Sequence, residues 1–166
     1  MRIKLELQNK KNLQLFFFIF LFLTISRLIP HEPNFTPTLS ISILGFLFSK
    51  ILWFKVLIVL GSMFFSDLII GTHDFIIYTY FSLMILIIIS NSKNYIYMIF
   101  FGPLIFFIIT NFGVWLSSTY YTKNIDGLIE CFYMAIPFFK NTIISTFFYC
   151  ILILLTKNFY PIQKKI

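Results

Sequence analysis

Charged residues are scarce in this chain of 166 residues: they make up 11% of it, and only six are acidic. Glycine and proline are also few, with six of each, so no Pro/Gly-rich linker separates domains. The two cysteines, Cys131 and Cys150, are too few for a disulfide framework, and no CxxC spacing marks a metal site. These absences exclude a disulfide-stabilised scaffold and favour a single domain.

Catalytic signatures are absent as well. The sequence contains no HExxH, GxSxG or Walker A motif, so we expect neither an enzyme nor a bound cofactor, and no ATP hydrolysis by the chain itself. An intramembrane enzyme would need a pair of carboxylates, and only Asp67 and Asp74 lie close enough in the sequence to form one. That hypothesis stays as a minor alternative.

Long apolar runs dominate what remains. Apolar residues make up 59% of the chain, and its mean hydropathy of +0.91 lies far above that of soluble proteins. We therefore predict an all-α integral membrane protein, a single domain over residues 1–166 that lies in the lipid bilayer as a bundle of six transmembrane helices. The helices are expected at residues 13–29, 38–50, 53–70, 75–90, 95–117 and 141–156, with an interfacial segment at residues 127–139.

The net charge of +7 does not indicate a nucleic-acid partner, because the thirteen Lys and Arg are dispersed among the apolar runs. Six crossings put both termini on one side of the membrane. In that topology, all but three of the thirteen Lys and Arg lie on the side of the termini. Cytoplasmic loops carry the excess of Lys and Arg, so we predict cytoplasmic N- and C-termini and a multi-pass protein of the cytoplasmic membrane. The three external cations are Arg27, Lys123 and Lys140.

Polar residues gather at the opposite, external ends of the predicted helices. They include both histidines and all but one of the acidic residues: His31, Glu32, Asp67, His73, Asp74, Asp126 and Glu130. Acidic residues hardly influence the orientation of a membrane protein, so this clustering needs another cause. We interpret it as a candidate binding site.

The segment from Arg27 to Pro37 carries three prolines in eight residues, which leave this external loop few conformations. A rigid loop at the mouth of the bundle suits a preorganised site, with Arg27, His31 and Asn34 as its contacts. The alternative is a stiff connector whose arginine reaches the lipid headgroups.

Asp67 lies inside the third predicted helix, and His73 follows in the loop beyond it. Ionisable groups at membrane depth face the bundle interior and find partners, and Arg27 is the obvious partner for Asp67. The pair either contacts the solute or only fixes the first helix to the third. The histidines and the acids that follow them, Glu32 and Asp74, form too weak a pattern to predict a metal site.

Two more external segments supply candidates. Asn111 lies about 10 Å below the outer end of the fifth helix, so its amide needs partners. Trp115 either forms an apolar wall of the site or sits at the membrane interface as a belt aromatic. Asn141, next to Lys140, is expected to cap the last helix, whose free N–H groups would then attract an anion.

Four stretches resemble a family of small bacterial multi-pass membrane proteins described as transport proteins of unestablished function. They are RLIPHEPNFTP (27–37), SDLIIGTHDFIIY (66–78), TNFGVWLSSTYY (110–121) and PFFKNTIIS (137–145). That family is similar in turn to the S components of energy-coupling factor transporters, which have six helices and an outward-facing pocket. The similarity implies capture of a solute outside the cell and coupling to an ATPase module. The chain departs from the expected pattern where Ser145-Thr146 replaces Gly-Asp, and where the segment after Pro37 is not rich in Ala and Gly.

The sequence therefore predicts an S-component-like transport protein that captures a small polar solute at its external face. The predicted contacts are Arg27, His31, Asn34, Asp67, His73, Asn111, Trp115 and Asn141. Energy would come from a partner ATPase module or from a gradient. The alternative is a membrane scaffold or assembly subunit whose external loops hold a partner protein.

Overall fold

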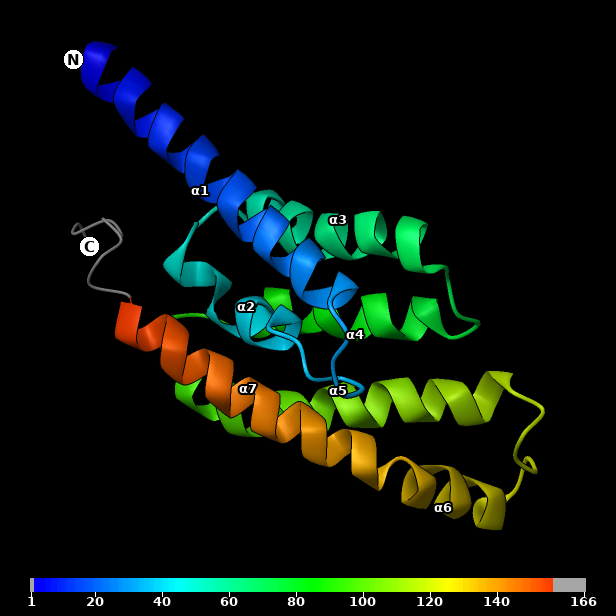
Figure 1. Ribbon diagram of the computed structural model, residues 1–166. Coiled ribbons are helices and arrows are strands. Elements are labelled where there is room, and N and C mark those ends of the chain that lie inside the picture. Colours follow the sequence, from blue (N-terminus) through cyan, green and yellow to red (C-terminus); the bar gives the residue numbers. More distant parts are fainter. Residues whose placement is uncertain (1, 157–166) are drawn as a thin grey trace.

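The computed structural model describes residues 2–156, with side chains from residue 12 onward. All regular structure in this part of the chain is helical, which confirms the predicted all-α class (Figure 1). The elements are α1 (Arg2–Leu28), α2 (Thr38–Leu44), the 3-10 helix η1 (Gly45–Leu47), α3 (Leu52–Ile70), α4 (Ile76–Ile89), α5 (Tyr95–Ser117), α6 (Ile125–Met134) and α7 (Ile136–Thr156). Lys157, Lys164 and Lys165, which the charge count assigns to the cytoplasmic side, lie outside the described residues.

Three of these helices, α3, α5 and α7, are long and apolar enough to cross a membrane. They have 19, 23 and 21 residues. At about 1.5 Å per residue they are about 28 to 35 Å long, close to the thickness of the hydrocarbon core, about 30 Å. The apolar part of α1 (12–28), α2 with η1 (38–47) and α4 are shorter. Large apolar side chains such as Leu68, Phe100 and Leu155 are exposed on the outside, as fits a membrane protein.

Neighbouring helices pack in the order α1, α3, α4, α5 and α7, and α6 packs beside α5. Figure 1 shows that α1 begins and α7 ends at one end of the bundle. The turns between α3 and α4 and between α5 and α6 lie at the opposite end, which we call the outer end (Figure 1). α2 lies in the centre, in contact with α3, α4, α5 and α7.

The central helix α2 is buried along its whole length. Its small hydroxyl side chains allow close contact, and Ser40 Oγ donates to the backbone O of Thr146 in α7 at 3.1 Å. We expected a helix over residues 38–50, but α2 ends at Leu44 and the chain turns through η1. A glycine, Gly45, directly follows the last residue of α2, although the apolar run continues beyond it. Gly45 lies close to the aliphatic part of Lys55 in α3.

The chain after α5 forms two consecutive helices, and the first, α6, is shorter than the interfacial segment expected there. The side chain of Asn124 caps α6, because its Oδ1 accepts a hydrogen bond from the N–H of Gly127 at 2.9 Å. The next helix, α7, begins at Ile136, and the predicted start at Asn141 was wrong. From the sequence, Pro137 suggests the end of the preceding segment. In the first turn of a helix, however, a proline leaves no hydrogen bond unmade and favours helix initiation.

Candidate functional site

A cavity of about 590 Å³ lies in the outer half of the bundle, among α1, α2, α3, α4, α5 and α7. Its lining combines polar and apolar side chains from these helices and from the loops that follow α1 and α3. The lining residues are Arg27, His31, Pro33, Asn34, Thr36, Thr38, Leu39, Met63, His73, Thr79, Leu83, Phe106, Phe107, Thr110, Asn111, Phe138 and Thr142.

Arg27, in the last turn of α1, makes the most extensive polar contacts of the lining. Its Nη2 donates to Asp67 Oδ1 at 2.6 Å. Its Nη1 donates to Ser66 Oγ at 2.6 Å and to the backbone O of Met63 at 3.0 Å. Tyr80 Oη donates to the second carboxylate oxygen of Asp67 at 2.6 Å. The predicted Arg27–Asp67 ion pair is therefore confirmed, and together with the Tyr80 hydrogen bond it joins α1, α3 and α4.

Asp67 itself does not line the cavity. Its side chain is only 3% exposed, and both carboxylate oxygens accept hydrogen bonds, from Arg27 and from Tyr80. A buried carboxylate needs such partners, because removing one would leave a charge in a medium of low dielectric. Asp67 thus positions Arg27, and the guanidinium is the group that borders the cavity.

The loop over residues 29–37 forms part of the cavity wall and is fixed to α7. Asn141 Nδ2 donates to the backbone O of Pro33 at 3.2 Å, and Ser145 Oγ donates to the backbone O of Asn34 at 3.2 Å. Asn34 has a φ of 64°, in the left-handed region that asparagine tolerates better than most residues. Asn141 is therefore not the helix cap that we expected, because it lies inside α7 and holds this loop.

Three polar side chains on α5 and α7 line the cavity from the other side: Thr110, Asn111 and Thr142. Each donates to the backbone O of the residue four positions earlier in its own helix, at 2.8 Å. A hydroxyl has one hydrogen to donate, so the two threonines offer acceptor oxygens to the cavity. Asn111 offers its Oδ1 together with its second amide N–H.

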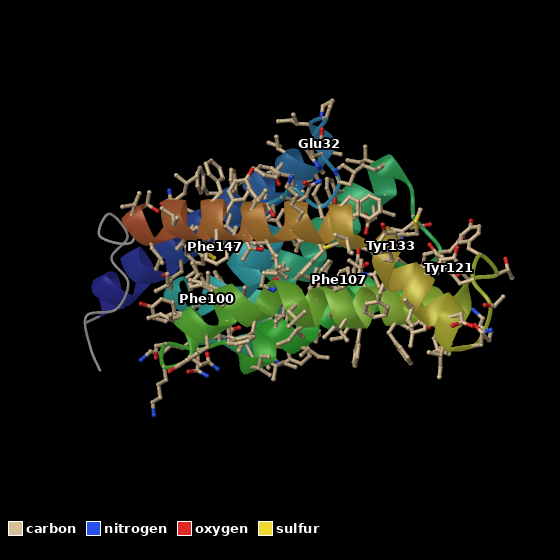
Figure 2. The ribbon with its side chains drawn as sticks, turned by 90° about the horizontal axis from the view of Figure 1, so that it is seen from below. Glu32, Phe100, Phe107, Tyr121, Tyr133 and Phe147 are labelled. Carbon is tan, nitrogen blue, oxygen red and sulfur yellow. The ribbon has the colours of Figure 1, made fainter. Side chains whose placement is uncertain are left out.

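Aromatic rings form the apolar part of the lining, with Phe106 and Phe107 from α5 and Phe138 from α7. Figure 2 shows Phe107 between these two helices. Its ring stacks on that of Phe139 with a centroid distance of 4.5 Å, and it meets the ring of Phe132 edge-on at 5.3 Å. These contacts hold the ring in one orientation beside the polar groups.

The structure brings five of the eight predicted contacts to the cavity: Arg27, His31, Asn34, His73 and Asn111. The other three lie elsewhere: Asp67 lies behind Arg27, Asn141 lies in α7 and holds the loop over residues 29–37, and Trp115 lies in the last turn of α5 and binds the segment that follows it.

Trp115 takes part in the connection between α5 and α6. Its Nε1 donates to the backbone O of Thr122 at 3.0 Å, and the Lys123 ammonium lies 5.9 Å from the centre of its ring. Lys123 also donates to the backbone O of Trp115 and of Ser118, at the C-terminal end of α5, where the helix dipole favours a cation. This placement agrees with an interfacial aromatic rather than with a cavity wall.

The acidic residues of the external cluster other than Asp67 are exposed: Glu32, Asp74, Asp126 and Glu130. Figure 2 shows Glu32 standing away from the helices. Among the described residues, no group of three His, Cys, Asp or Glu side chains is placed to hold a metal ion. The cluster therefore contributes one buried carboxylate and two histidines to the surroundings of the cavity.

Several lining residues were not predicted: Thr36, Thr38, Thr79, Thr110, Thr142, Phe106, Phe107 and Phe138. The threonines carried a usable signal, because hydroxyl side chains within apolar helices favour helix–helix contacts and cavities over lipid. The phenylalanines carried none, since the chain has 24 of them and many have exposed rings.

A scan against protein-family models matches residues 7–165 to a family described as "Family of unknown function (DUF6580)". No curated protein and no solved structure gives a significant match. None of these comparisons links the chain to a transport protein or to an S component of an energy-coupling factor transporter.

Proposed function

Because the chain belongs to the family of unknown function DUF6580, we propose its role from its own cavity. The protein captures a small polar solute at the external face of the cytoplasmic membrane, as an S component of an energy-coupling factor transporter does. The observation that carries this proposal is the cavity of about 590 Å³. Ligand sites commonly have volumes of about 300–1,000 Å³ and combine apolar walls with a few well-placed polar groups.

The proposed topology has six crossings. α3, α5 and α7 span the membrane fully, and the apolar part of α1, α2 with η1, and α4 complete the bundle between them. The shared end at which α1 begins and α7 ends supports an even number of crossings (Figure 1). With the termini in the cytoplasm, all but three of the Lys and Arg residues lie on the cytoplasmic side. The outer end of the bundle then faces the outside of the cell.

In the proposed mechanism the solute enters at the outer end, beside the loop over residues 29–37, and binds between Arg27 and Asn111. The fixed loop and the ion-paired arginine give a preorganised site, which lowers the entropy lost on binding. Release on the cytoplasmic side requires a movement of the bundle. An associated ATPase module or a gradient supplies the energy, as in transporters whose repeats or bundles rock around a central site.

The proposal is tested with the purified full chain in detergent, by thermal unfolding in the presence of amino acids, organic acids, sugars, nucleobases and metal ions. We expect at least one solute to raise Tm in proportion to the logarithm of its concentration. Asn111→Leu, which replaces a polar side chain of the cavity with an apolar one of the same branching, should reduce the shift. Ile108→Leu is the matched control, because Ile108 lies on the same helix with a side chain that is 48% exposed.

A second measurement is uptake of the same solute by cells that carry the protein. Saturable uptake whose KM is raised by Asn111→Leu at normal membrane abundance would support capture for transport. If no solute changes Tm and a partner protein co-purifies with the chain instead, the alternative of a membrane scaffold or assembly subunit takes its place.

A further inference from the structure

The charges of the cavity lining have one sign. Its titratable side chains are Arg27, His31 and His73, and no carboxylate is among the lining residues. Asp67 balances the formal charge of Arg27, but it lies behind the guanidinium with both oxygens engaged. A ligand in the cavity therefore meets N–H groups of the guanidinium and no carboxylate, which disfavours a cation.

Two N–H groups of Arg27 remain available to a ligand. A guanidinium has five N–H groups, and the three hydrogen bonds to Met63, Ser66 and Asp67 use three of them. The Nε–H and one Nη2–H have no acceptor among the residues that the structure describes. Two N–H groups of one guanidinium suit the two oxygens of a carboxylate, and such charge-assisted pairs are about twice as strong as neutral hydrogen bonds.

The opposite wall, on α5 and α7, offers mainly acceptors. The hydroxyl hydrogens of Thr110 and Thr142 are donated to their own helices, and Asn111 Oδ1 has no donor among the described residues. An O–H group of the ligand suits this wall best, because it can donate to Asn111 Oδ1 or to a threonine oxygen and accept from the second N–H of Asn111. No carboxylate lines this wall, so nothing favours an ammonium over a neutral donor.

Between the two polar walls the lining is apolar and largely flat. The rings of Phe106, Phe107 and Phe138 and the side chains of Leu39 and Leu83 border this part of the cavity. Aromatic rings prefer to pack against flat apolar groups in offset or edge-on arrangements. The central part of the ligand is therefore apolar, and a planar ring fits it best.

We propose that the solute is an organic acid in its carboxylate form, with a flat apolar body and a neutral hydrogen-bond donor at the end far from the carboxylate. The carboxylate pairs with the two remaining N–H groups of Arg27, and the donor binds Asn111 Oδ1 or a threonine hydroxyl. This inference rests on the proposed function, because it names the class of solute that the same cavity takes.

The test uses three aromatic acids of increasing length: 4-hydroxybenzoate, 4-hydroxyphenylacetate and 4-hydroxycinnamate. Each is compared with its carboxamide and with the same acid lacking the hydroxyl group, and tyramine serves as the cationic probe. Affinities for the purified full chain are measured by thermal shift and by isothermal titration calorimetry. We expect at least one hydroxy acid to bind about tenfold or more tightly than its carboxamide, and tyramine to give no binding.

Two variants test which residue binds each end of the ligand. Asn111→Leu should remove the preference for the 4-hydroxyl group while the carboxylate is still preferred over the carboxamide. Arg27→Lys should remove the preference for the carboxylate, and Ile108→Leu should change neither. If Arg27→Lys lowers the yield of folded protein, Asn111→Leu alone still tests the proposal.

The outcomes separate this inference from the proposed function. If a carboxamide or tyramine binds as tightly as the acids, or if only solutes outside this class bind, the carboxylate assignment is wrong while capture of a solute stands. If neither these acids nor any compound in the broader panel binds, both proposals are wrong.

Discussion

The aromatic ring of Tyr78 in α4 lies directly against Gly113 in α5, in the space that a Cβ atom at residue 113 would need. The hydroxyl group of the same tyrosine forms a hydrogen bond of 2.5 Å with Ser117 Oγ, one helical turn further along α5. The two contacts join α4 to α5 beside the cavity, since the lining residue Thr79 follows Tyr78 and the lining residue Asn111 lies two positions before Gly113. The absence of a side chain at residue 113 therefore sets how closely these helices approach.

Gly113→Ala should lower the stability of the bundle. The added methyl group would overlap the Tyr78 ring, and overpacking of this kind commonly costs about 1–3 kcal/mol. Thermal unfolding of the purified protein measures the change. Gly61→Ala is the control, because its new Cβ would meet only the end of the Phe20 ring, at 3.3 Å. If both variants unfold at the same temperature, the contact with Tyr78 does not limit helix packing.

Asp67→Asn should destabilise the protein more strongly. It leaves Arg27, whose side chain is 16% exposed, without its carboxylate partner, and breaking a buried pair from one side costs on the order of 3–5 kcal/mol. The double variant Arg27→Met, Asp67→Leu should recover much of this loss, because it removes both charges. It should still fail to bind the solute. Recovery of stability together with normal binding would show that the pair is structural only.

Asn141→Ala should loosen the loop over residues 29–37. The variant loses the hydrogen bond to the backbone O of Pro33, a contribution of about 0.5–1.5 kcal/mol, while α7 keeps its own hydrogen bonds. Hydrogen–deuterium exchange should become faster in the loop and stay unchanged in α3. Lys140→Ala, at the exposed neighbouring position, should leave exchange in both segments as it is. Equal protection of the loop in both variants would contradict the role given to Asn141.

Cys131 should react slowly with maleimide. Its side chain is buried in α6 and donates to the backbone O of Asn111 at 3.4 Å, and burial raises the pKa of the Cys131 thiol. Only the thiolate reacts readily, so a raised pKa lowers the reactive fraction at every pH below it. In a Cys150→Ser background, maleimide labelling should be roughly tenfold slower than at a cysteine placed at the exposed Thr119, and should accelerate as the pH rises towards 9. Similar rates at neutral pH would argue against burial.

Labelling also tests the proposed topology. Glu32→Cys lies in the loop over residues 29–37 and Lys93→Cys in the turn between α4 and α5, and both positions are exposed. A membrane-impermeant maleimide should label Glu32→Cys in intact cells and Lys93→Cys only after permeabilisation. The two native cysteines are buried and should contribute little background. The opposite pattern would reverse the orientation, and labelling of both positions in intact cells would contradict the count of crossings.

The parts of the fold that the sequence predicted best are those with sharp changes of polarity. The helix over residues 95–117 was predicted with its observed bounds, because polar residues flank a long apolar run on both sides. The Arg27–Asp67 pair could also be predicted. Asp67 is an acid inside an otherwise apolar helix, and a lone cation stands at the corresponding end of the preceding long helix.

The sequence predicted less where one residue fits two arrangements. Pro137 fits both the end of one segment and the first turn of the next, so the start of α7 was misplaced and Asn141 was given the wrong local role. Trp115 fits both a cavity wall and an interface, and only the fold of the turn after α5 distinguishes them. The phenylalanines of the lining differ from the lipid-facing ones in tertiary position alone.

The short buried helix α2 has a consequence for biosynthesis. At seven residues, with Thr38, Ser40 and Ser42 among them, it is too short and too polar to enter a bilayer on its own. Its surroundings include α7, and Ser40 binds the backbone of Thr146, which the ribosome adds 106 residues later. The packing around α2 can therefore be completed only after α7 has been synthesised. Until then, contacts with the translocon or with the helices already synthesised must keep this segment out of the lipid.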